Sequence, residues 1–175
     1  MRFYIALFHH ELLHFFSSIL SGGITLLLFY RFKVSKISIL VVFSSALIGG
    51  FFIDLDHLID YIATYGFHFN LNCFLHGCQY LATKHVYIIF HGWELIVVLA
   101  VIAGLLLKKK PRDSKRTLLV LALVSFTTGL LAHLIIDSIT NEIALFGYSF
   151  FYRLFNNFEL EKFTKPHYDI YQFIK

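Results

Sequence analysis

Long apolar runs separated by short polar stretches dominate this chain. The runs cover residues 15–30, 37–53, 86–107 and 118–136. An α-helix needs about 20 apolar residues to cross the hydrocarbon core of a bilayer. The pattern therefore predicts an all-α polytopic protein with four transmembrane helices, near residues 9–30, 37–56, 86–107 and 117–137.

The stretch from residue 142 to residue 175 has a different pattern. It mixes acids, bases and aromatic residues without an apolar run of span length. Aromatic side chains concentrate where a membrane meets water, so we expect an interfacial C-terminal segment.

Composition agrees with a membrane protein. Of the 175 residues, 58% are hydrophobic and 15% are charged, with a mean hydropathy of +0.71. A soluble domain of this size is less apolar. No internal repeat is evident, and we expect one membrane-embedded domain over residues 1–175. The N-terminus lacks the pattern of a cleaved signal peptide, so the first span is expected to stay as an anchor.

The basic residues predict which loops face the cytoplasm. Nine of the 15 lysines and arginines lie in two short loops, as Arg31, Lys33, Lys36, Lys108, Lys109, Lys110, Arg112, Lys115 and Arg116. Loops rich in these residues stay cytoplasmic, which places both termini and residues 54–85 on the extracytoplasmic side. The net charge of +4 is not spread along one polar face, which argues against nucleic-acid binding and leaves membrane lipids as expected partners.

Ionisable and histidine side chains gather at the extracytoplasmic end of every predicted span. They are His10 and His14 in the first, Asp54 to Asp60 in the second, His91 and Glu94 in the third, and His133 and Asp137 in the fourth. An ionisable side chain within a membrane-spanning helix is costly unless it faces a cavity, pairs with another group or binds a metal. One convergent site among the helices is the economical explanation.

The stretch from Asp54 to Asp60 is the densest of these groups. On a helix, Asp54 and His57 lie three residues apart on one face, while Asp56 and Asp60 lie four apart on another. Carboxylate oxygens and imidazole nitrogens together suit a divalent cation such as zinc or manganese. Acids that simply meet water at a helix end are the alternative.

Two further spacings favour metal chemistry. His10, Glu11 and His14 match H-E-x-x-H, in which two histidines one helical turn apart bind zinc and the glutamate acts as base. The extensions of the known zinc peptidases are absent after His14, although an acidic ligand from a later helix would still fit an intramembrane peptidase. His133 and Asp137 also lie one turn apart, and Asn141 continues their stripe.

The order of these motifs resembles the YdjM-like inner-membrane metal-dependent hydrolases. The resemblance covers roughly residues 8–158 and is carried by His14, the run Asp54-Leu55-Asp56-His57, His91 and the pair His133 and Asp137. That family is similar in turn to zinc-dependent phospholipase C and nuclease folds. The resemblance implies an inner-membrane enzyme that hydrolyses a phosphoester or lipid substrate.

These observations predict a metal-dependent hydrolase with one or two zinc ions, manganese being possible. The expected ligands are His14, Asp54, His57, His91, His133 and Asp137, followed by His10 and Asp56. These exceed the four ligands of one tetrahedral zinc, so two metals or one metal with supporting residues are implied. A metal-activated water would be the nucleophile, with Glu94 or Glu11 as base. A zinc peptidase using His10, Glu11 and His14, or a divalent-metal transporter, are the alternatives.

The residues after the fourth span suggest a substrate contact. Arg153 follows Tyr152 at the end of an aromatic tract, and its planar fork suits an anionic phosphate oxygen. Arg153, Tyr152 and Asn141 are the expected substrate-binding residues, although Arg153 as a membrane anchor is an equal alternative. Cys73 and Cys78 form either a small disulfide loop or two separate thiols.

Overall fold

The computed structural model describes residues 2–30, 35–108, 114–141 and 143–164. Its elements are helical, and the β pairing within these residues consists of two isolated antiparallel bridges. The all-α prediction is confirmed. The chain divides into two compact units, one made of Met1–Ile53 and Trp93–Thr140 and the other of Asp54–Gly92 and Asn141–Lys175. One functional domain over residues 1–175 stays a prediction.

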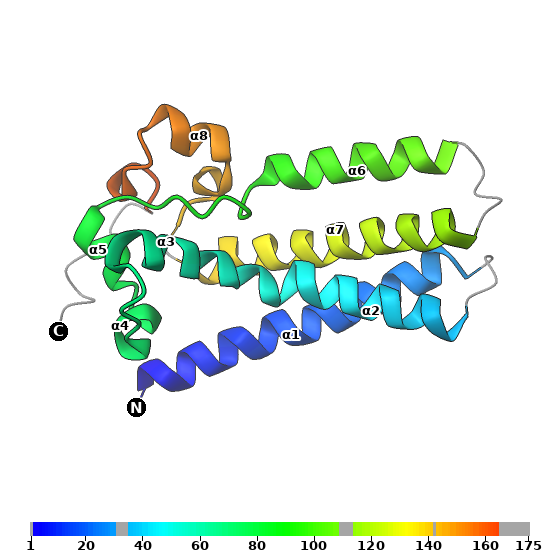
Figure 1. Ribbon diagram of the computed structural model, residues 1–175, viewed down its shortest axis with the longest axis horizontal. Helices are drawn as coiled ribbons and strands as arrows, with labels where there is room; N and C mark the ends of the chain where they lie inside the picture. Colours follow the sequence, from blue (N-terminus) through cyan, green and yellow to red (C-terminus); the bar gives the residue numbers. More distant parts are fainter. Residues whose placement is uncertain (1, 31–34, 109–113, 142, 165–175) are drawn as a thin grey trace. The chain divides into compact units, whose positions relative to one another are not determined.

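The first unit contains four helices, drawn as long ribbons in Figure 1. They are α1 (Arg2–Leu28), α2 (Lys36–Gly50), α6 (Trp93–Lys108) and α7 (Ser114–Thr140). Helix α7 packs against each of the other three, and α1 also packs against α2. Helix α7 is therefore the central element of this unit.

Small residues allow α2 and α7 to approach closely. A Cβ added at Gly129 on α7 would lie 2.5 Å from the carbonyl oxygen of Ala46 on α2. Nearby, the Ser125 hydroxyl donates to the carbonyl oxygen of Val42 at 2.6 Å. Helices that pack in a membrane commonly use small residues and hydroxyl bonds in this way, because lipid provides no hydrophobic drive between them.

Among the described residues, two helices are long and apolar enough to cross a membrane, over Leu7–Leu28 and Lys115–Thr140. A third span is possible if Lys36–Gly50 and Phe52–Tyr65, which meet at a bend of 51°, form one broken crossing. Helix α6 has 16 residues, about 24 Å of helix against a hydrocarbon core of about 30 Å. The structure thus supports membrane association through two or three spans, and a fourth span is not shown.

The prediction that the third span begins at residue 86 is wrong at its start, because α6 begins at Trp93. Residues 86–92 are not helical. Val86 and Ile88 are each 2% exposed and alternate with exposed Tyr87 and Ile89. This alternation is typical of extended chain, whose side chains point to opposite sides in turn.

The second span also differs from its prediction over residues 37–56. Helix α2 ends at Gly50, and a 3₁₀ turn, η1 (Phe52–Asp56), leads into α3 (His57–Tyr65). The dense group of acids and histidine therefore begins on a 3₁₀ turn rather than on a continuous helix.

The second unit is built from short elements joined by an extended segment. Besides α3, they are α4 (Leu71–Leu75), α5 (Cys78–Thr83), η2 (Leu145–Tyr148), α8 (Phe150–Phe155) and η3 (Leu160–Lys162). His85 forms an antiparallel bridge with Glu159, and Val86 N donates to the carbonyl oxygen of Phe158 at 3.0 Å. Buried Val86 and Ile88 share a hydrophobic cluster with Leu160 and Phe163.

Some predictions fall on residues outside the described ranges. They concern Arg31, Lys33, Lys109, Lys110 and Arg112 in the predicted cytoplasmic loops, residue 142, and residues 165–175 of the expected interfacial segment.

Candidate metal centres

Helices α1 and α7 bring together the first group of predicted ligands. His10 and His14 lie one turn apart on α1, and His133 and Asp137 lie one turn apart on α7. This spacing places each pair on one side of its helix. His14 and His133 are completely buried, and Asp137 is 3% exposed. We call these four residues the helix cluster.

The distances within the helix cluster are short. His10 Nε2 and His14 Nε2 are 2.9 Å apart, and they lie 3.4 Å and 3.1 Å from Asp137 Oδ1. His133 Nε2 lies 3.3 Å from the other carboxylate oxygen, Asp137 Oδ2. Zinc with ligands at 2.0–2.1 Å has neighbouring ligand atoms about 3.3 Å apart. The distances from Asp137 to the three imidazoles are close to this spacing, and His10, His14 and Asp137 offer ligand atoms that all lie within 4.8 Å of one another.

Hydrogen-bond partners determine which nitrogen of His133 carries the proton. Its Nδ1 lies 3.1 Å from the carbonyl oxygen of Gly50. A carbonyl oxygen only accepts, so Nδ1 is the donor. In the neutral ring, Nε2 is then a lone pair that faces the Asp137 carboxylate.

The same reasoning applies to His10. The Thr140 hydroxyl donates to the carbonyl oxygen of Ile136 at 2.9 Å, so its oxygen accepts from His10 Nδ1 at 3.2 Å. In the neutral ring, His10 Nε2 is therefore also a lone pair. With neutral rings, the helix cluster directs two imidazole lone pairs and a carboxylate toward one another, an arrangement that either a proton or a metal ion stabilises.

The second unit holds another group of predicted ligands: Asp54 and Asp56 on η1, His57 at the start of α3, and His91 before α6. We call it the turn cluster. His91 Nε2 and His57 Nε2 lie 3.1 Å and 3.4 Å from the same oxygen, Asp54 Oδ1. His91 is completely buried, and Asp56 is 4% exposed.

Asp56 fixes the orientation of His91. Its carboxylate accepts from His91 Nδ1 at 3.0 Å and from Phe90 N at 3.0 Å. Histidines that bind metals usually donate their other ring nitrogen to a carboxylate or carbonyl in this manner. His91 therefore presents Nε2 to Asp54.

The carboxylates also change the acidity of His91. Burial alone would lower its pKa, but the hydrogen bonds to Asp54 and Asp56 outweigh that effect and raise the pKa to about 9. A positive charge at His91 Nε2 is thus favourable in the metal-free protein. A metal ion would supply positive charge at the same place.

Tyr80 on α5 supports the other histidine of the turn cluster. Its hydroxyl is hydrogen-bonded to His57 Nδ1, so His57 also turns Nε2 toward Asp54. Burial raises the pKa of the Tyr80 phenol, and the charge of Asp60 adds to the effect, so the phenol stays protonated.

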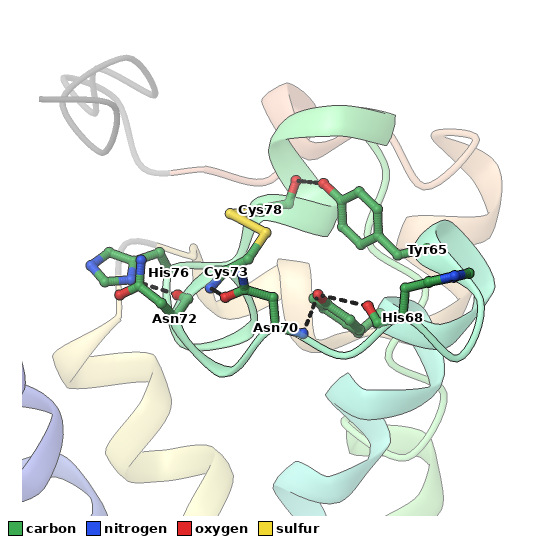
Figure 2. Close-up of a disulfide and its surroundings, with 8 residues drawn as sticks. Tyr65, His68, Asn70, Asn72, Cys73, His76 and Cys78 are labelled. Carbon is green, nitrogen blue, oxygen red and sulfur yellow. Dashed lines mark hydrogen bonds between the residues drawn. A yellow bond between two sulfur atoms is a disulfide. The ribbon is translucent and has the colours of Figure 1, made fainter.

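Figure 2 shows Cys73 and Cys78 joined as a disulfide in the second unit. The Asn70 side chain caps α4 by accepting from Cys73 N at 3.0 Å. Tyr65 donates to the carbonyl oxygen of Cys78 at 3.2 Å. Of the two alternatives left open by the sequence, the structure has the disulfide.

The predicted catalytic glutamates are both half-buried residues of the first unit. Glu11 lies between His10 and His14 on α1, and Glu94 is the second residue of α6. Their role as base stays a prediction.

The predicted substrate-binding residues have partners inside the second unit. Arg153 on α8 is completely buried and donates from Nη2 to the carbonyl oxygen of His91 at 2.9 Å. Tyr152 donates to the carbonyl oxygen of Lys162 at 3.3 Å, and Asn141 donates to the Tyr148 hydroxyl at 3.2 Å. Substrate binding by these residues stays a prediction.

Sequence reasoning missed the supporting partners of the histidines. The Gly50 carbonyl and the Thr140 hydroxyl orient His133 and His10, and Tyr80 orients His57. Only Thr140 had a usable signal, because it lies seven residues after His133 on the same helix and so nearly on the same face.

Comparison with known proteins adds no relative. No protein-family model, curated protein or solved structure matches this chain.

Proposed function

We propose that this protein is a membrane-bound, metal-dependent hydrolase. The observation that carries the proposal is the shared orientation of four histidines. His10, His57, His91 and His133 each engage Nδ1 in a hydrogen bond and turn Nε2 toward a carboxylate of their own cluster. Imidazoles and carboxylates arranged in this way are typical of metal ligands held by supporting hydrogen bonds.

Each cluster offers enough donors for one divalent ion. In the helix cluster, His10, His14 and Asp137 would bind it, with His133 held against the other carboxylate oxygen of Asp137. In the turn cluster, His57, His91 and Asp54 would bind it, with Asp56 behind His91. Nitrogen and carboxylate donors suit zinc, and manganese is an alternative.

A bound ion of this kind supplies Lewis acidity and lowers the pKa of coordinated water. The residues of the chain would contribute orientation and proton transfer. Asp137 and Asp54 hold imidazoles in place, and a half-buried Glu11 or Glu94 would accept a proton. A phosphoester or lipid substrate follows from the resemblance to YdjM-like hydrolases and is part of the proposal.

The proposal keeps the extracytoplasmic orientation predicted from the basic loops and the inner-membrane location that the family resemblance implies. The Cys73–Cys78 disulfide supports it, because disulfides persist in oxidising compartments. A fourth span through α6 would need residues flanking its 16-residue helix, or local thinning of the bilayer.

Metal analysis of protein purified without metal-affinity resin tests the proposal. Wild type is expected to carry one or two zinc or manganese ions per chain and to hydrolyse a chromogenic phosphodiester. Asp137→Asn and Asp54→Asn should each reduce metal content and activity. Glu161→Gln, which alters an exposed acid outside both clusters, is the matched control. Metal-free wild type that also fails to bind added zinc or manganese would refute the proposal.

A second candidate function, an intramembrane zinc peptidase, has its own supporting observation. The histidines of the H-E-x-x-H motif lie on one helix with Nε2 atoms 2.9 Å apart, and Asp137 provides an acidic atom near both. Glu11→Gln should abolish a peptidase. The same variant would retain phosphodiester hydrolysis if Glu94 is the base, and Glu94→Gln would then lose it.

A further inference from the structure

A pocket of about 310 Å³ lies within the second unit. Its walls come from α3, α5 and the segment that follows α5, and they are formed by Asp60, Ala63, Thr64, Gln79, Tyr80, Thr83, His85 and Tyr87. No lysine or arginine is among the lining residues. The pocket volume is at the small end of the usual range for ligand sites, which suits a small polar group.

Asp60 gives the pocket a buried carboxylate. Asp60 is only 6% exposed. Its Oδ2 accepts hydrogen bonds from Tyr87 N at 2.9 Å and from Ile88 N at 3.3 Å. These partners are neutral amides, and in the described part of the chain Asp60 has no salt bridge to a lysine or arginine. Backbone amides thus solvate the Asp60 carboxylate, and no lysine or arginine of the described residues neutralises it.

Gln79 adds a second acceptor. It is 2% exposed, and its side chain is hydrogen-bonded to Tyr80. Among the described residues, Gln79 Oε1 has no hydrogen-bond partner. A buried carbonyl oxygen without a donor is unfavourable, and nearly all such atoms in native proteins find a partner in protein, water or ligand.

The lining therefore selects a ligand rich in donors. A phosphate or carboxylate group would meet the Asp60 carboxylate and the Gln79 carbonyl with no lysine or arginine to offset the repulsion, His85 being the imidazole in the lining. A protonated primary amine offers three N–H donors and a positive charge. The rings of Tyr80 and Tyr87 also favour a cation.

We propose that this pocket binds a primary ammonium group, with Asp60 and Gln79 Oε1 as its acceptors. At a membrane, such a group occurs on ethanolamine lipid headgroups and on free amines, which share this chemistry. The proposal concerns binding alone and holds whether or not the metal clusters hydrolyse a substrate.

Calorimetric titration of the detergent-purified chain with ethanolamine tests the site, with and without added zinc. Wild type should show saturable binding. Asp60→Asn keeps an oxygen for the two amides but removes the charge, and Gln79→Met keeps the side-chain length but removes the acceptor. Each variant should weaken binding at least tenfold. Tyr65→Phe, which removes one hydrogen bond of the same unit outside the pocket, should stay within twofold.

The ligand series gives the result that decides the chemistry. Choline, which has no N–H donor, and glycerol, which has no charge, should each bind at least tenfold more weakly than ethanolamine. Equal binding of either ligand, unchanged binding by Asp60→Asn, or no binding by folded wild type would overturn the proposal. Nanodiscs of phosphatidylethanolamine and of phosphatidylcholine identify the source. Stabilisation by the first alone supports a lipid headgroup, and binding of free ethanolamine without that preference supports a soluble amine.

Discussion

Replacing Thr140 by valine should weaken metal binding in the helix cluster without unfolding the protein. Valine has nearly the shape of threonine and removes only the hydroxyl. That hydroxyl donates to the carbonyl oxygen of Ile136 and accepts from His10 Nδ1 at 3.2 Å. Without it, His10 loses the partner that keeps Nε2 as a lone pair facing His14 and Asp137.

The size of the effect follows from two magnitudes. A net hydrogen bond contributes about 0.5–1.5 kcal/mol, and changes to the partners of metal-binding histidines weaken metal affinity about 10–100-fold. His10 is the most exposed member of the helix cluster, with 21% of its side chain accessible. We therefore expect the lower end of the range, roughly tenfold, or about 1.4 kcal/mol.

A competition titration between the protein and a chromophoric zinc chelator measures this change. Thr127→Val is the matched control, because the Thr127 hydroxyl also donates to the carbonyl four residues earlier on α7, that of Leu123, at 2.6 Å. Thr127 has no such bond to a cluster histidine among the described contacts. Both variants should melt within a few degrees of wild type when metal is removed.

Two outcomes would refute this reasoning. If Thr140→Val binds zinc as tightly as wild type, within a factor of two, His10 is not oriented by Thr140 or is not a ligand. If Thr127→Val loses affinity equally, the effect comes from α7 as a whole and not from the hydrogen bond to His10.

Three further predictions concern packing, pH and redox state. Gly129→Ala should destabilise the protein by about 1–3 kcal/mol, because the added Cβ would lie 2.5 Å from the Ala46 carbonyl oxygen. Gly104→Ala on α6 is the control, because a Cβ there meets open space and should be neutral or slightly stabilising. Thermal unfolding in detergent compares the two variants. With chelator present, the stability contributed by protonated His91 should be complete below pH 6.5 and be lost as the pH rises through about 9, because the pKa of His91 is raised in the folded protein. His91→Gln should flatten the dependence of the melting temperature on pH between about pH 6 and 10. Cys73 and Cys78 should react with a thiol reagent on intact cells only after reduction, and labelling without a reductant would contradict the disulfide and its oxidising location.

The sequence correctly predicted the helices that are marked by long apolar runs. Helix α1 contains the apolar run 15–30 as far as Leu28, helix α7 contains the run 118–136, and their spans agree with the predictions near residues 9–30 and 117–137. Residues 86–92 could not be separated from a span by the same criterion, because a short apolar run is read equally well as helix or strand. Pairing of residues 85 and 86 with residues 158 and 159 determined the outcome, and such distant pairing leaves no local signal.

The candidate site shows a similar division. Helical spacing was sufficient to select His10 with His14 and His133 with Asp137 as pairs. The orientation of each ring depends on atoms that spacing does not reveal. For His133 that atom is a backbone carbonyl oxygen. Every residue has one, so the residue type at position 50 gives no signal, and the role of this carbonyl became visible only with the α2–α7 contact.

The composition of the two clusters bears on which metal ion each would prefer. The helix cluster combines three imidazoles with one carboxylate, and such nitrogen-rich sets favour zinc. The turn cluster combines two imidazoles with Asp54 and Asp56, and a larger share of carboxylate oxygen moves the preference toward a harder ion such as manganese. Asp56, however, already accepts from His91 Nδ1 and Phe90 N, so it acts mainly to orient His91. With Asp54 as the effective carboxylate ligand, the turn cluster retains two nitrogens for each ligating carboxylate, and zinc stays the first choice for both clusters.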